Sequence, residues 1–221
     1  FGRCNKVVDA MRPRDFASLA CFFLAPESIQ QDFVTTRVSA YARYTTDIPF
    51  VQIVDIMSED EYVTRQQQGQ IQQKPQSYSY EDKNVRINVE FSEPLPLVVR
   101  KRQDISDSGY RVGDKEYFMH ITVNNIGNGF MDPIRASQFY IRPVAESQPG
   151  SAVQVFPDDV LYCPDLKNTA WSITSIGKAF PRITCKIQLP ASVRVLENYG
   201  ILFNLRYVYE VRDSVEVKIV R

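Results

Sequence analysis

Residues 201–209 read ILFNLRYVY, and every second side chain in this stretch is large and apolar. A period of two is the pattern of a β-strand with one face in a protein core, because successive side chains point to opposite faces of a sheet. Burial of each such side chain contributes roughly 1.5 to 3 kcal/mol. The stretch is therefore expected to be a central strand of a β-rich domain.

Other alternating segments lie before and after this stretch. Residues 85–91 (VRINVEF), 117–123 (YFMHITV) and 215–219 (VEVKI) share its period of two. Further β-prone runs are residues 136–141, 152–156 and 183–189. Short strands with turns between them, and no long helix that would make a parallel crossover, predict an antiparallel Ig-like or fibronectin-like β-sandwich.

The preceding part predicts a smaller α+β or partial β module. Residues 33–44 and 50–57 are β-prone, and the turn chemistry of residues 46–49 (TDIP) predicts that they pair as a hairpin. Ser58 and Glu61 have the spacing of a capping box, which predicts a short helix to about Gln68, before Gly69.

A Gln-rich stretch lies between the two predicted modules. Its composition is typical of a solvated linker. The predicted organisation is a helical segment with a small β module over residues 1–70, a linker over 66–84, and the mostly-β sandwich over 85–221.

The amino-acid composition limits the classes of protein to which the chain can belong. Hydrophobic residues make up 44% and aromatic residues 12% of the 221 residues, which indicates a packed core. Basic and acidic residues balance at 26 each without a basic cluster, so nucleic acid is not an expected partner. No apolar run approaches the roughly 20 residues of a membrane helix, so membrane association is expected only through a segment not shown. The first residue, Phe1, indicates a processed protein or a fragment.

The four cysteines form two local pairs, Cys4 with Cys21 and Cys163 with Cys185. Neither pair has the close spacing of a zinc or redox motif, so no metal site is expected. Two disulfides would fit an oxidising, extracellular compartment, and four buried thiols are the alternative.

The sequence does not predict an enzyme, a metal site or a cofactor. His120 is the single histidine, and its place on a strand beside Phe118 indicates a partly exposed structural residue. The acids Asp104, Asp107, Asp158 and Asp159 are interpreted as turn residues, with calcium binding left open.

Two sets of side chains are candidate contact surfaces. Tyr78 and Tyr80 adjoin the Gln-rich stretch and are expected to be exposed. The first segment carries the apolar residues Phe16, Leu19, Phe22 and Phe23, which make it a candidate for donation to a partner.

Several of these segments resemble a known group of domains. Residues 117–129 (YFMHITVNNIGNG), Cys163, Cys185 and residues 205–211 (LRYVYEV) resemble adhesion-type Ig-like domains related to the CARDB group, which recur in archaeal cell-surface proteins. Residues 40–44 (AYARY) and 51–62 are similar to the preceding module of such chains. The resemblance implies an extracellular sandwich without catalytic residues.

The leading hypothesis is a noncatalytic extracellular structural protein, a subunit of a surface layer, filament or adhesin. It would contact other protein subunits, as a homo-oligomer or larger assembly, through sheet edges or a donated segment. The alternatives are a carbohydrate- or receptor-binding module of a larger envelope protein or enzyme, and a virion structural protein.

Overall fold

The computed structural model describes residues 32–99, 116–144, 147–148, 151–152, 161–189 and 196–220, with positions 7, 8, 11, 18, 20–24, 29 and 30. The chain forms two compact units. The larger unit is Ala42–Val211, and the smaller one combines Phe1–Tyr41 with Arg212–Arg221. Two long strands, β1 (Phe33–Ser58) and β14 (Leu196–Val220), contribute residues to both units.

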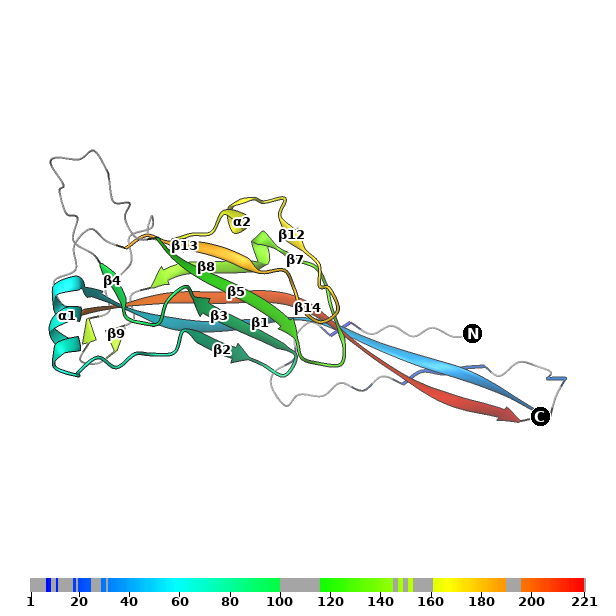
Figure 1. The fold of residues 1–221 in the computed structure, drawn as a ribbon. Helices are drawn as coiled ribbons and strands as arrows, with labels where there is room; N and C mark the ends of the chain where they lie inside the picture. The colour runs from blue at the N-terminus through cyan, green and yellow to red at the C-terminus, as the bar shows by residue number, and fades with distance from the viewer. Residues whose placement is uncertain are drawn as a thin grey trace. The chain divides into compact units, whose positions relative to one another are not determined.

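The first sheet of the larger unit is built on β1 and β14, which run side by side (Figure 1). Its order is β4 (Leu97–Val99), β1, β14, β6 (Phe130–Met131). Strand β8 (Phe139–Val144) pairs antiparallel with residues Gly200 to Leu205 of β14. Strand β4 joins β1 in parallel at Ile56–Ser58.

The second sheet is antiparallel throughout. Its order is β11 (Leu161–Tyr162), β13 (Ile183–Ile187), β5 (Tyr117–Asn125), β3 (Val85–Phe91) and β2 (Ser77–Glu81). Every second residue of β3, β5 and β13 is buried. The strands predicted at residues 85–91 and 117–123 are therefore confirmed.

Short elements complete the larger unit. They are the strand pair β7 (Ile134–Arg135) with β12 (Ser172–Ile173), the pair β9 (Ser147–Gln148) with β10 (Ser151–Ala152), the 3-10 turn η1 (Ala136–Gln138) and the helix α2 (Pro164–Lys167). The run predicted at 136–141 therefore begins as a 3-10 turn. Of the run predicted at 152–156, only Ala152 is described, in β10.

A single apolar cluster lies between the two sheets. Its centre is the predicted core strand, whose alternate residues Ile201, Phe203, Leu205, Tyr207 and Tyr209 are at most 1% exposed. The cluster confirms a mostly-β antiparallel sandwich. The finer Ig-like or fibronectin-like topology stays a prediction.

Aromatic rings join the sheets across this core. The Phe50 ring on β1 stacks on Tyr80 of β2, with centroids 3.8 Å apart, and on Phe203 of β14, with centroids 4.7 Å apart. Stacked rings bury large apolar areas and add roughly 0.5 to 1.5 kcal/mol per pair beyond that burial. The stack therefore fixes how the two sheets lie on each other.

Tyrosine hydroxyls make polar links between the same two sheets. Tyr80 donates to Gln52 Oε1 at 2.7 Å, and Tyr117 donates to the Val98 carbonyl at 2.7 Å. Tyr209 donates to Asn125 Oδ1 at 3.1 Å. Because a buried hydroxyl without a partner costs roughly 1 to 3 kcal/mol, these bonds allow the tyrosines to lie in the core.

Gly129 is required by close packing against Tyr209. Its amide donates to the Tyr209 hydroxyl at 2.8 Å, and a Cβ at this position would lie 2.3 Å from the Glu210 carbonyl oxygen. A glycine is needed here because two chain segments approach each other closely. Its backbone is not left-handed.

Helix α1 (Glu59–Gln67) begins and ends as predicted. The Ser58 hydroxyl accepts a hydrogen bond from the Glu61 amide, and Gly69 follows the helix with a φ of 63°. The Glu61 carboxylate pairs with Arg65 at 2.5 Å, one turn further along the helix.

The predicted hairpin over residues 33–57 is wrong, because β1 is one continuous strand. Its expected turn stays extended: Ile48 is buried in the core, and the Asp47 carboxylate accepts from Arg206 of β14 at 2.9 Å. Pro49 is tolerated because, in the part of the chain that the structure describes, β4 pairs with β1 only at Ile56–Ser58.

The division into units also differs from the predicted boundary at residues 66–84. Residues 42–58 of β1 lie in the sheet that contains β14, and β2 occupies Ser77–Glu81 within the predicted linker. Strand β1 places its apolar residues in the same core as β3 and β5, so no separate small β module forms from them.

The Cys163–Cys185 disulfide is present, with the two Cα atoms 4.1 Å apart. It connects the start of α2 to the central residue of β13. Cys21 is also disulfide-bonded, and Cys4 lies outside the described residues, so the pairing of these two stays a prediction.

Substitution Phe203→Ala is expected to destabilise the protein by about 3 to 5 kcal/mol, because it removes a fully buried ring from the aromatic stack. Denaturant unfolding measures the change. Val215→Ala on the same strand is the matched control, since Val215 is 60% exposed and its loss should cost less than about 0.5 kcal/mol. Equal losses for the two variants would contradict the assignment of Phe203 to the core.

Replacement of Cys163 and Cys185 together by alanine is expected to cost about 3 kcal/mol, because the bridge closes a loop with a sequence separation of 22 residues. The midpoint of urea unfolding should fall accordingly. Reducing agent should lower the midpoint of the wild-type protein and leave that of the double variant less affected. A double variant as stable as the oxidised wild type would show that the bridge does not stabilise the fold.

Candidate functional site

The smaller unit contains a two-stranded ribbon, defined as residues 33–41 of β1 and 212–220 of β14. Many of its residues are β-branched, which favours extended structure. An isolated pair of strands is only marginally stable in water, because it buries little apolar surface. None of the residues of the ribbon is buried.

Cross-strand contacts fix the register of the ribbon. Arg37 pairs with Glu216 at 3.3 Å, and the Arg212 guanidinium lies 5.5 Å from the centre of the Tyr41 ring. Residue numbers rise on β1 as they fall on β14, which is antiparallel pairing. The same register continues in the larger unit, where Tyr44 contacts Tyr209 and Phe50 contacts Phe203.

This register gives the ribbon two different faces. Val38 lies opposite Val215, and side chains two positions apart on a strand share a face. We define the apolar face of the ribbon as Val34, Thr36, Val38, Ala40, Val215, Val217 and Ile219, with Asp213 at its margin. Val215 is 60% exposed, and Val34 and Val217 are nearly 40% exposed.

The opposite face of the ribbon combines charged side chains with the exposed Phe33, Tyr41 and Val220. It carries the Arg37–Glu216 pair and the contact of Arg212 with Tyr41, and the Lys218 ammonium lies 4.0 Å from the centre of the Phe33 ring. Exposed ion pairs and cation–π contacts contribute roughly 0.2 to 1 kcal/mol each. These contacts hold the two strands in register without burying the apolar face.

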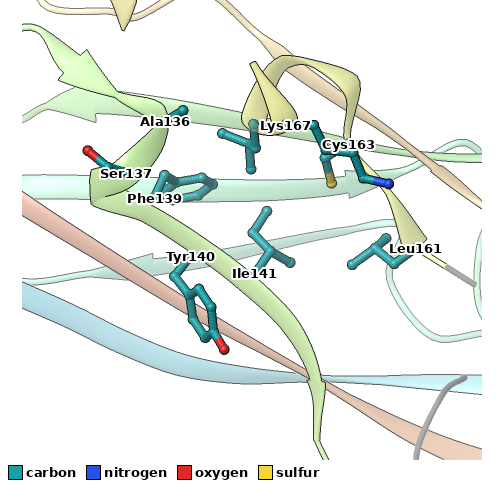
Figure 2. A pocket seen from close by; sticks show the side chains of 9 residues that line it. Ala136, Ser137, Phe139, Tyr140, Ile141, Leu161, Cys163 and Lys167 are labelled. Atoms are coloured by element: carbon teal, nitrogen blue, oxygen red, sulfur yellow. The ribbon is translucent and has the colours of Figure 1, made fainter. Parts of the chain in front are cut away.

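A shallow groove of about 270 Å³ lies elsewhere, in the larger unit (Figure 2). It is bordered by β8, by β11 and by α2, and its apolar wall includes Phe139, Ile141 and Leu161. Tyr140 and Lys167 supply polar atoms at its rim. The apolar wall suits an apolar side chain.

Tyr78 and Tyr80 do not form the exposed surface predicted for them. Both pack on the core, because they lie on the face of β2 that is turned toward β1. Tyr80 stacks on Phe50, and the Tyr78 ring meets Phe91 edge-on with centroids 6.1 Å apart. The period of two across residues 77–81 was the signal that they belong to a strand.

The candidates in the first segment are only partly described. Phe22 is 92% exposed and Phe23 is 51% exposed, so both are available to a partner. Leu24 beside them is also exposed. Phe16 and Leu19 lie outside the described residues.

His120 is a half-buried residue on the outer face of the second sheet, as expected for a strand position between Met119 and Ile121. Its Nδ1 lies 3.1 Å from the Thr184 hydroxyl. Burial lowers the pKa of His120, and the nearby Arg182 charge lowers it further, whereas Glu90 opposes the shift. These contacts satisfy the imidazole within the sheet.

Asp82 and Asp55 each make a polar contact beside a tyrosine. The Asp82 carboxylate accepts from the Tyr207 hydroxyl at 2.5 Å, and burial followed by this bond raises the pKa of Tyr207. Asp55 pairs with Lys74 at 2.5 Å, and burial raises the pKa of the neighbouring Tyr78. Tyr207 therefore stays protonated and acts as the hydrogen-bond donor to Asp82.

Neither a metal-binding cluster nor a membrane-spanning helix is found among the described residues. In the described ranges no group of three or more His, Cys, Asp or Glu side chains could hold a metal ion. Asp104, Asp107, Asp158 and Asp159 lie outside those ranges. No helix among the described residues is long and apolar enough to cross a membrane.

Comparison with known proteins finds no matching family, no matching curated protein and no matching solved structure. The resemblance to CARDB-related domains therefore stays a prediction.

The ribbon was missed as a site because its sequence resembles that of the core strands. Residues 215–219 alternate like 201–209, but their other face carries only the charged residues Glu216 and Lys218, whereas that of 201–209 also carries Leu202, Asn204 and Val208. Smaller side chains, valine in place of phenylalanine and tyrosine, were the available signal that this end of β14 leaves the core.

His120 should make stability depend on pH. Its pKa is about 6.5 in the unfolded chain and lower in the folded protein, so the unfolded state binds more protons between the two values. The neutral imidazole's contribution is therefore present above about pH 6.5 and lost as the pH falls through that window. His120→Gln should flatten the fall of the urea midpoint between about pH 7 and pH 5. The same fall in both proteins would contradict this.

Proposed function

We propose that this chain is a noncatalytic structural protein that assembles with other protein subunits outside the cell. The observation that carries the proposal is the apolar face of the ribbon, on which Val34, Ala40, Val215 and Val217 are exposed in the single chain. Contiguous exposed apolar side chains mark sites of protein contact, because water contact with them is unfavourable.

The chemistry of the ribbon supports a protein partner over a small ligand. Its apolar face is flat and built from aliphatic side chains, whereas small molecules bind in concave sites that enclose most of their surface. Strand edges also offer backbone donors and acceptors that another strand can pair with. The exposed residues Phe22, Phe23 and Leu24 add a second apolar segment in the same unit.

The disulfides support a location outside the cytoplasm. The Cys163–Cys185 bridge persists in oxidising compartments, and reducing systems keep such thiols reduced in most cytosols. A surface layer, a filament, an adhesin and a virion are all assemblies that such a subunit can build. An image of the purified native assembly distinguishes them.

Substitution of Val34 and Val217 together by lysine tests the proposal. Two charges on the apolar face should make its burial unfavourable and shift the protein toward monomer, with an association constant lower by roughly tenfold or more. Sedimentation velocity over a range of concentrations measures this shift. The larger unit should keep its thermal transition, because both residues are exposed.

Thr35→Lys with Ser39→Lys is the matched control, since it adds the same charge to the opposite face of the ribbon at exposed positions. This control should assemble like the wild type. The proposal is overturned if the wild-type protein is monomeric at all concentrations, or if the lysines at 34 and 217 leave assembly unchanged.

A further inference from the structure

The outer edge of β14 in the ribbon is a long strand edge. On the side away from β1, β8 pairs with residues 200–205 and β6 with Tyr209 and Glu210. From Val211 to Val220, the described part of the chain supplies no strand that pairs with this edge. A long edge of this kind is a template for pairing with another strand.

The charges along this edge are self-complementary. Residues 210–218 read EVRDSVEVK, so an acid, a base, Ser214, an acid and a base follow at every second position. If two copies pair antiparallel with Ser214 opposite Ser214, Arg212 of each faces Glu216 of the other. Glu210 and Lys218, which flank this pair, also carry opposite charges. Opposite charges at directly facing positions stabilise an antiparallel pair.

The other edge of the ribbon lacks this property. Residues 33–44 of β1 carry Arg37 and Arg43 and no acidic residue. Any antiparallel pairing of this segment with itself that brings these residues together therefore places like charges near each other, which is unfavourable. The charge pattern favours one edge of the ribbon, and it favours a second copy of the same chain.

We propose that residues Val211–Val217 of β14 pair antiparallel with the same residues of a second copy, about a two-fold axis through Ser214. This inference rests on the proposed function and names its partner and contact. The paired span ends at Val217, because Phe130 of β6 already holds the position opposite Glu210. The partner chain leaves the edge at Lys218.

This pairing keeps each face of the ribbon on one side of the joined sheet. Residues that face each other across the axis are both odd or both even in number, so Val211 lies opposite Val217 and Asp213 opposite Val215. The two apolar faces then form one surface across four strands. Isologous contacts of this kind close as a dimer and do not extend into an open chain.

Substitution Ser214→Cys gives a direct test. Facing residues of an antiparallel pair have Cα atoms roughly 4.5 to 5.5 Å apart, which is within the range for a disulfide. Mild oxidation of the full chain should therefore yield a covalent dimer on nonreducing gels. Ser39→Cys is the matched control, because Ser39 lies opposite Ser214 on β1 and is also exposed. It should yield at least roughly tenfold less dimer.

Charge reversal tests the register. Glu216→Arg should weaken the dimer roughly tenfold or more, because it places like charges at two symmetric contacts. Arg37→Glu is its control: it makes one like-charged pair with Glu216 inside the chain but leaves the contacts between copies unchanged, so it should weaken the dimer less than about threefold. The double variant Arg212→Glu with Glu216→Arg restores opposite charges across the axis. It should recover at least about half of the loss in the logarithm of the association constant.

The outcomes separate this inference from the proposed function. Efficient cross-linking of the Ser214→Cys variant together with charge rescue supports both. If the wild type assembles by sedimentation but Ser214→Cys does not cross-link, or the double reversal restores nothing, the edge assignment is overturned and the proposed function stands. If the wild type is monomeric at every concentration, both are overturned.

Discussion

The antiparallel pairing of β1 with β14 is the interaction on which the rest of the structure depends. In the larger unit this pair carries β4 on one side and β6 and β8 on the other, so it forms the centre of the first sheet. It also supplies Phe50 and Phe203, whose rings connect that sheet to Tyr80 of the second. In the smaller unit the same two strands form the ribbon. One register, set by contacts from Phe50 with Phe203 to Arg37 with Glu216, serves both units.

The environment of the pair changes along its length although its backbone does not. From Ile201 to Tyr209 the alternate side chains are aromatic or large and aliphatic, and they are buried by the facing sheet. Beyond Val211 the alternate side chains are smaller, and those on the other face form an ion pair and cation–π contacts. Exposed contacts of this kind contribute far less than burial of a large ring. The side chains of the ribbon are thus held in register by weak polar contacts, while much of its apolar area stays exposed.

The sequence predicted much of this fold and little of its site. Period-two patterns located β3, β5 and the buried half of β14, because one face of each strand is buried and strictly apolar. The same reasoning failed at residues 46–49, where the local turn chemistry of Asp47 and Pro49 is overridden by the ion pair of Asp47 with Arg206 and the burial of Ile48. It also assigned Tyr78 and Tyr80 to the surface, since their stacking partners Phe50 and Phe91 are distant in sequence. Whether an alternating strand is covered depends on the rest of the chain, and so the ribbon could not be distinguished from a core strand by its period alone.

In the assembly that we propose, the apolar face and the strand edge of the ribbon would have different roles. An apolar face favours association with any complementary apolar surface, because the hydrophobic effect has no direction and does not select a register. Backbone pairing at a strand edge has direction, but it accepts a shift of two residues at little cost when both faces are unspecific. Alternating charges make such a shift of register unfavourable. A shift of two residues one way would bring Arg212 opposite Lys218, which replaces facing opposite charges with like charges. The same shift the other way would require Glu216 to face Glu210, a position that Phe130 of β6 already occupies. In the dimer that we propose, the apolar face would supply the tendency to associate, and the pattern around Ser214 would supply the selection of partner and register.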